Sequence, residues 1–286
     1  MSEEGPGPNV RRRQLGRELR KLREKADMTL KDAAKFAGLT STTISRIEGG
    51  KQTILTRNVR LLCQCYDIGE PMLDTLIRLA EQSNERGWWT GFSVSLPDWF
   101  ESFVGLESDA AEVWRYSPNF IDGLLQTPEY AAAFLELGEK VTEQSVKQQA
   151  EFRRARQDRV NREDDPAKLR VVLDEAALRR KVGGTDVLRD QIRHLVELAE
   201  RPNITIQVVP FDAGAYVGMQ SPFHLLRFAG GFDDLDAVYL ENQRGAVWME
   251  RPTDITYYIR LFERMTDIAL AADETADFMD HLASSL

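Results

Sequence analysis

The 286-residue chain is poor in cysteine and histidine, the residues on which disulfide frameworks and most transition-metal sites depend. Its cysteines are Cys63 and Cys65, and its histidines are His194, His224 and His281. Two cysteines cannot make a disulfide framework, which favours a reducing, cytoplasmic location. Residues 63 and 65 point to different faces of a helix, and the histidines are far apart in the sequence. We therefore expect no metal site and no cofactor.

Long apolar runs and common catalytic motifs are also missing. No apolar run approaches the roughly 18 residues that span a bilayer. The first ten residues, MSEEGPGPNV, lack the apolar stretch of a secretory signal. The sequence contains no HExxH, no GxxxxGK[S/T] and no GxGxxG motif. We expect a protein that is neither an enzyme nor a membrane protein.

The charges that are present are unevenly distributed. Residues 9–66 hold 14 Lys or Arg against five acidic residues, a net charge of +9, although the whole chain carries −9. A short basic segment before a long acidic one indicates a phosphate-binding module attached to a second domain. The alternative is an ordinary solvated surface. The length agrees with about two domains, and 42% hydrophobic residues is typical of globular proteins.

Residues 9–82 have the periodicity of a bundle of short helices. Leu15, Leu19 and Leu22 recur at spacings of four and three in a basic background, which is one stripe of an amphipathic helix. Thr29 is suited to cap a second helix, and Gly38 to end it. Helices are expected at about 12–25, 30–37, 41–48, 56–66 and 71–82.

A glycine-containing turn between the second and third of these helices predicts a helix-turn-helix. In the third helix Ile44 and Ile47 can face the core, so its hydroxyls and its guanidinium point largely the other way. Such groups suit base edges in the major groove, where Arg can bind both acceptors of guanine. Lys51 and Arg57 follow the helix, where the phosphates of bound DNA would run.

Residues 20–51 (RKLREKADMTLKDAAKFAGLTSTTISRIEGGK) resemble the lambda/434-repressor-like helix-turn-helix of the XRE family. The resemblance spans about 55 residues and implies sequence-specific binding to double-stranded DNA, and hence a place at the nucleoid when bound. One such helix reads few base pairs, so we expect a homodimer on two half-sites. A helix-turn-helix used for protein contacts alone is the alternative.

The resemblance also implies roles for single residues. The base contacts would be Thr40, Ser41, Thr42 and Arg46, and the phosphate contacts would be Thr29, Lys51 and Arg57. Arg23 and Glu48 match an ion pair that ties the first helix to the third. Leu30 stands where the family often has a glutamine that donates to a phosphate.

The sequence pattern of residues 98–286 predicts a mixed α/β domain with a small sheet of about five strands, after a connector at 83–97. The strands are expected at 169–173, 204–209, 223–228, 237–240 and 246–249, the last four as neighbours. Helices are expected near 98–105, 128–137, 142–163, 175–181, 185–200, 254–271 and 273–283.

Short motifs in this part resemble the C-terminal domain of actinobacterial regulators of the Scr1 antitoxin-like (WhiJ-like) group, over about residues 85–280. The motifs are GLLQTPEY at 123–130, RxxRQ at 153–157, LDEAAL at 173–178, RPN at 201–203, VPF at 209–211, PF at 222–223 and VYLE at 238–241. The resemblance implies transcriptional regulation through this domain. Its members often sit beside a gene for a small partner protein. An antitoxin-like protein that sequesters that partner is one alternative, and a small-molecule sensor is another.

Two features of the second domain leave ligand binding open. Trp114, Tyr116, Phe120 and Gln126 surround an apolar turn and could form a pocket for a ligand or partner, although helix packing also explains the turn. Arg153 and four further arginines up to residue 162 make a basic cluster that acidic neighbours dilute. A solvated helix is the default interpretation of this cluster, and contact with a phosphate or an acidic partner is the alternative.

Overall fold

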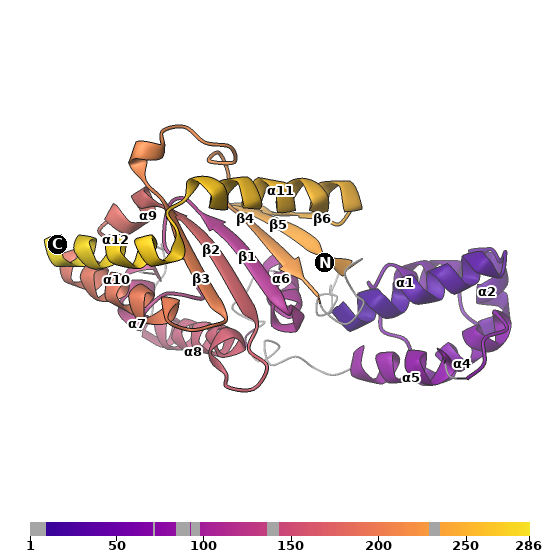
Figure 1. The fold of residues 1–286 in the computed structure, drawn as a ribbon. Coiled ribbons are helices and arrows are strands. Elements are labelled where there is room, and N and C mark those ends of the chain that lie inside the picture. The colour runs from indigo at the N-terminus through magenta and orange to yellow at the C-terminus, as the bar shows by residue number, and fades with distance from the viewer. Residues whose placement is uncertain (1–9, 71, 84–91, 93–97, 136–142, 229–234) are drawn as a thin grey trace. The chain divides into compact units, whose positions relative to one another are not determined.

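The computed structural model describes residues 10–70, 72–83, 92, 98–135, 143–228 and 235–286 (Figure 1). It divides into two compact units, residues 1–109 and 110–286, which are described in turn. Apart from Ser83 and Phe92, the predicted connector lies outside the described residues. The helix at 98–109 groups with the first unit rather than the second.

The amino-terminal unit is all-α, as the sequence predicts. Its helices are α1 (Val10–Lys25), α2 (Leu30–Ala37), α3 (Ser41–Glu48), α4 (Thr56–Cys65), α5 (Met72–Ser83) and α6 (Asp98–Asp109). The expected stripe packs as predicted: Leu15 and Leu19 of α1 are buried in one core with Ile44 and Ile47 of α3.

Local signals begin and end the helices around the turn. Thr29 caps α2, because its hydroxyl accepts a hydrogen bond from the backbone N–H of Asp32 while the Asp32 carboxylate accepts from the Thr29 N–H. Gly38 ends α2 with a φ of 67°, a left-handed conformation that glycine adopts without strain. Thr40 caps α3 by accepting from the N–H of Thr43. The turn that orients α3 is thus encoded locally.

The carboxy-terminal unit contains one sheet of six strands in the order β3-β2-β1-β4-β5-β6. The strands β1, β2 and β3 are parallel, whereas β4, β5 and β6 are joined antiparallel to each other and to β1. The strands are β1 (Glu112–Ser117), β2 (Lys168–Asp174), β3 (Ile204–Val209), β4 (Phe223–Arg227), β5 (Ala237–Asn242) and β6 (Gly245–Met249). The helices are α7 (Pro128–Leu135), α8 (Glu143–Asn161), α9 (Glu175–Arg179), α10 (Thr185–Ala199), α11 (Pro252–Ile268) and α12 (Ala272–Ser285), with a 3-10 turn at Phe211–Ala213.

The mixed α/β fold is confirmed, and two details of the predicted sheet are wrong. All five predicted strands are present, but β1 is a sixth strand that the sequence interpretation missed. The expectation that the last four strands are neighbours holds for β4, β5 and β6 and fails for β3, which pairs with β2. A helical crossover through α9 and α10 connects β2 to β3, so these two strands run parallel.

Helices cover both faces of the sheet, with α11 on one face and α8 on the other (Figure 1). Successive residues of β1 point to opposite faces. Trp114 and Tyr116 join an apolar cluster with Phe262 of α11. Between them Arg115 forms a buried ion pair with Asp122. The central strand therefore has one apolar face and one face with a buried charge.

Candidate nucleic-acid interface

The third helix presents one face to the core and a polar face to solvent. Ile44 and Ile47 are buried at 0% and 3% exposure. Within the part of the chain that the structure describes, no hydrogen bond or ion pair engages the Arg46 side chain, so its donors are available to a ligand. The exposed residues at this face are Thr40, Ser41, Thr42, Ser45 and Arg46.

Thr40, one of these residues, also caps the helix α3. The hydroxyl of Thr40 accepts from the Thr43 N–H at 3.1 Å and lies 2.8 Å from the Thr43 hydroxyl. These contacts hold the first turn of α3, so Thr40 serves the helix as its cap as well as being a predicted base contact. Ser41, Thr42 and Arg46 carry no such bond among the described residues.

A buried ion pair ties α3 to α1. Nε of Arg23 donates to Oε1 of Glu48 at 2.7 Å, and Nη2 donates to Oε2 at 2.9 Å. Nη1 of Arg23 donates to the Met28 carbonyl at 2.8 Å, which adds the turn before α2 to the same contact. Arg23 and Glu48 are 9% and 8% exposed. This bidentate ion pair holds the C-terminal end of α3 against α1.

A second contact between α1 and α3 depends on the absence of a side chain. A Cβ added to Gly16 would lie 2.7 Å from the Glu48 carbonyl oxygen and also against that of Ile47. Real Cβ atoms do not approach backbone oxygens so closely, so only glycine permits this packing. Gly16 and the ion pair thus position the same end of α3.

The three predicted phosphate contacts are all exposed. Thr29 lies at the start of α2, Lys51 just after α3 and Arg57 in the first turn of α4. Leu30 packs against the core. That position therefore contributes to packing and offers no hydrogen-bond donor on its side chain.

The surroundings of α3 are basic. The first turn of α3 contains no acidic residue, and the acid in its last turn, Glu48, is neutralised by Arg23. The exposed cations on α2, on α3 and in the segment that follows are Lys31, Lys35, Arg46, Lys51, Arg57 and Arg60. Exposed cations around a polar helix face are the arrangement that binds a polyphosphate backbone.

The four residues of the predicted ligand or partner pocket lie in different surroundings. Trp114 and Tyr116 are core residues at 3% and 0% exposure, and Phe120 packs on the Phe134 ring at 4.8 Å. The side chains of β1 alternate across a sheet that helices cover on both faces, so Trp114 and Tyr116 pack in the core, whereas Phe120 lies after β1 and is exposed. Gln126 lines a cavity between α7 and α8.

The sequence interpretation also missed polar groups inside this unit. Arg115 pairs with Asp122, and His224 lies opposite Arg115 in the register of β1 and β4. The expectation of a solvated α8 is wrong for one face, because Arg156 is only 8% exposed. Helical spacing was the available signal: Arg153, Arg156 and the following glutamine recur at i, i+3 and i+4, so they share one face.

Neither metal ligands nor a membrane segment is found among the described residues. No group of three or more His, Cys, Asp or Glu side chains is placed to hold a metal ion in that part of the chain. None of its helices is long and apolar enough to cross a bilayer.

Asp174 caps α9 by accepting from the Ala176 N–H at 2.8 Å, as expected for an acid at a helix start.

Comparison with known proteins finds two families along the chain. Residues 14–76 match a family described as "Helix-turn-helix domain". Among solved structures, the chain matches the clp gene regulator ClgR from C. glutamicum at 20% identity, with a TM-score of 0.22, over 28% of this chain and 99% of that one. A TM-score of this size does not establish a shared fold. No curated protein matches the chain.

The amino-terminal unit therefore contains a helix-turn-helix domain, with α2 and α3 as its helices. Residues 100–281, which are more than half of the chain, match the family described as "Domain of unknown function (DUF5753)". The chain belongs to the DUF5753 family.

Proposed function

We propose that this protein is a sequence-specific DNA-binding transcriptional regulator whose α3 enters the major groove. The observation that carries the proposal is the exposed polar face of α3, which the Arg23–Glu48 pair and Gly16 hold in place within the basic segment 9–66. Arg46 reads a guanine, and Thr40, Ser41 and Thr42 contact neighbouring bases. Thr29, Lys51 and Arg57 hold phosphates and set the orientation of the helix.

A single α3 reads only a few base pairs, so the proposal includes a homodimer. Two copies would place their helices in successive major grooves, about 34 Å apart. The carboxy-terminal unit would supply dimerisation and regulation. Membership of the Scr1 antitoxin-like group and pairing with a small protein stay predictions of the sequence resemblance.

Binding-site selection from random duplex DNA tests this function. The full-length protein is used at a stated salt concentration, because phosphate contacts make affinity depend strongly on salt. The expected result is an enriched site of two inverted half-sites, one helical turn or a multiple of it apart. Failure to enrich any sequence would contradict sequence-specific binding, and a single half-site would contradict the dimer.

Substitution of Arg46 then tests the base contact on the selected site. We expect Arg46→Ala to cost about 1–3 kcal/mol of specific binding and to relax the preference at one base pair. Arg260→Ala, which removes an exposed cation from α11, is the charge-matched control and should bind as the wild type does. If Arg46→Ala binds the selected site as tightly as the wild type, Arg46 does not read a base.

A further inference from the structure

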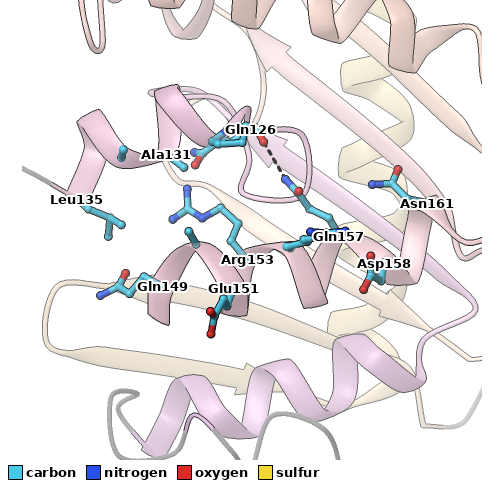
Figure 2. Close-up of a pocket in the computed structure, with 13 residues that line it drawn as sticks. Gln126, Ala131, Leu135, Gln149, Glu151, Arg153, Gln157, Asp158 and Asn161 are labelled. Carbon is cyan, nitrogen blue, oxygen red and sulfur yellow. Dashed lines mark hydrogen bonds between the residues drawn. The ribbon is translucent and has the colours of Figure 1, made fainter. Parts of the chain in front are cut away.

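A cavity of about 570 Å³ lies between α7 and α8 of the carboxy-terminal unit. Its volume is in the range of small-molecule sites, about 300–1,000 Å³. Pro128, Ala131 and Leu135 of α7 give it an apolar wall. Figure 2 shows Arg153 extending from α8 toward Gln126 and Ala131. The cavity thus combines an apolar surface with a few polar groups, as small-molecule sites do.

Gln126 lines this cavity and has an unsatisfied acceptor. The residue is 4% exposed, and its Nε2 donates to the Ile121 carbonyl at 2.6 Å. Because a carbonyl can only accept, the amide nitrogen must face Ile121 and Oε1 must face the other way. Oε1 is buried and has no hydrogen-bond partner in the structure. Gln157 holds the backbone of Gln126 in place by donating to its carbonyl oxygen at 2.8 Å.

Arg153, which also lines the cavity, has an unsatisfied donor. Its Nη1 is buried without a hydrogen-bond partner. Burial, and then the like charge of Arg156, lower the pKa of Arg153 to about 10, so the guanidinium still carries its charge at neutral pH. Asp122 is already bonded to Arg115 and to the Leu124 N–H. An anion in the cavity would therefore meet a cation that lacks a hydrogen-bonded counterion.

Gln191, a buried side chain close by, has hydrogen-bond partners that Gln126 Oε1 and Arg153 Nη1 lack. The side chain of Gln191, at 0% exposure, accepts from the Thr127 N–H at 2.7 Å and donates to the Leu125 carbonyl at 2.8 Å. Burying a polar group without partners destabilises a protein, so natural structures satisfy nearly all of them. Groups left unsatisfied at the same cavity point to a ligand that completes them.

The charges at the cavity limit the class of ligand. Glu151 and Asp158, which also line it, are exposed acids that outnumber its exposed cation, Arg154, so they oppose a second negative charge. A phosphate or a polycarboxylate is therefore disfavoured, whereas one carboxylate can pair with Arg153. A hydrocarbon portion of the ligand can pack on the apolar wall that α7 gives the cavity.

We propose that the cavity between α7 and α8 binds a small organic monocarboxylate that has an apolar body and one N–H or O–H donor. The carboxylate pairs with Arg153, the donor bonds to Oε1 of Gln126, and the apolar body packs on Ala131 and Leu135. The role of such a ligand in regulation rests on the proposed function, whereas its binding does not. The test is therefore made without DNA.

Calorimetric titration of the full-length protein tests the ligand class. The probe is β-hydroxydecanoate, and the matched compounds are decanoate, which lacks the hydroxyl donor, and the corresponding diol, which lacks the carboxylate. We expect β-hydroxydecanoate to bind at least about tenfold more tightly than either, since each lacks one partner of a buried group. No binding by any of the three, or equal binding by the diol, would overturn the proposal.

Arg153→Met tests the site itself, with Arg193→Met on α10 as the matched exposed control. We expect Arg153→Met to weaken β-hydroxydecanoate binding about tenfold or more and Arg193→Met to leave it unchanged. Without ligand, Arg153→Met should not lower Tm, because it removes a partly buried cation that lacks a partner. A lower Tm would show a structural role for Arg153, and unchanged ligand binding would place the ligand elsewhere. Either result would overturn the proposed site.

Discussion

The two units of this protein place their polar side chains in opposite ways. In the amino-terminal unit the predicted DNA contacts on α3 are exposed, and the buried pair Arg23–Glu48 serves to position them. In the carboxy-terminal unit Gln126 and Arg153 are withdrawn from solvent at a cavity. A duplex can be recognised by a solvated surface, because protein–DNA interfaces keep ordered waters between side chains, bases and phosphates. A small molecule needs a closed site whose groups are already desolvated. Replacing an exposed polar group on α3 should therefore change stability less than replacing a buried polar group in either unit.

The largest expected effect comes from breaking the buried pair of the amino-terminal unit. Glu48→Ala leaves the Arg23 guanidinium buried without its partner, which should reduce the free energy of unfolding by about 3–5 kcal/mol. Urea unfolding of the full chain measures the loss. The double variant Arg23→Met with Glu48→Leu is the control and should recover most of it, because neither charge remains. A loss below about 1 kcal/mol in Glu48→Ala would show that the pair does not hold α3.

A smaller effect is expected at the close approach of α1 and α3. Gly16→Ala inserts a methyl group against backbone oxygens of α3, which should reduce the free energy of unfolding by about 1–3 kcal/mol. Gly69→Ala is the matched control, because a Cβ at that position meets nothing within 4 Å. The control should stay within about 0.5 kcal/mol of wild type in the same urea series. Equal effects at both glycines would contradict the role assigned to Gly16.

Acid should destabilise the carboxy-terminal unit through His224. Burial first, and then the like charge of Arg115, hold the pKa of His224 well below its ordinary value, with Arg156 acting the same way and Asp122 opposing them. Above about pH 6.5 the ring is neutral in both states, and below it only the unfolded chain takes up the proton. Stability should fall by up to about 1.4 kcal/mol per pH unit.

The contribution of one histidine is isolated by comparing urea unfolding of wild type and His224→Asn between pH 7 and pH 5.5. Burial also lowers the pKa of His194, and that contribution is common to both proteins. The substituted protein should lose less stability over this range. If both proteins lose the same amount, His224 titrates alike in the folded and unfolded chains.

The smallest effect is expected for a single phosphate contact. Lys51→Ala should weaken binding to all duplexes alike and reduce the slope of log affinity against log salt by about 0.9. Titrations of selected and random duplexes at several salt concentrations measure it. If Lys51→Ala instead weakened binding to the selected duplex alone, as is expected for Arg46→Ala, Lys51 would contact a base and not a phosphate.

Most of the amino-terminal unit is predictable because its determinants are close in sequence. The leucine spacing of α1, the cap at Thr29 and the turn at Gly38 each act within about one helical turn, and all lie where the sequence predicts. The contact between Arg23 and Glu48 spans 25 residues and could be expected only through a family resemblance. The need for glycine at position 16 was not predicted, because it depends on how two helices approach.

The strand β1 shows why the carboxy-terminal unit was harder to predict. Its sequence, EVWRYS, is buried on both faces, so it lacks the alternation of polar and apolar residues that marks a half-exposed strand. Arg115 would signal an exposed position, yet it is 2% exposed because Asp122 pairs with it. The aromatic residues of this strand were therefore predicted to line a pocket, whereas Trp114 and Tyr116 are buried in the core.

The sequence by itself determined the helix-turn-helix, the polar face of α3 and the mixed α/β class of the second unit. Periodicity, caps and turns are local, so they can be read along the chain. The tertiary structure alone decided that Gln126 and Arg153 meet at one cavity, since 27 positions of chain separate them. Whether a polar side chain ends up solvated or buried without a partner depends on what packs over it, and that is a property of the whole fold.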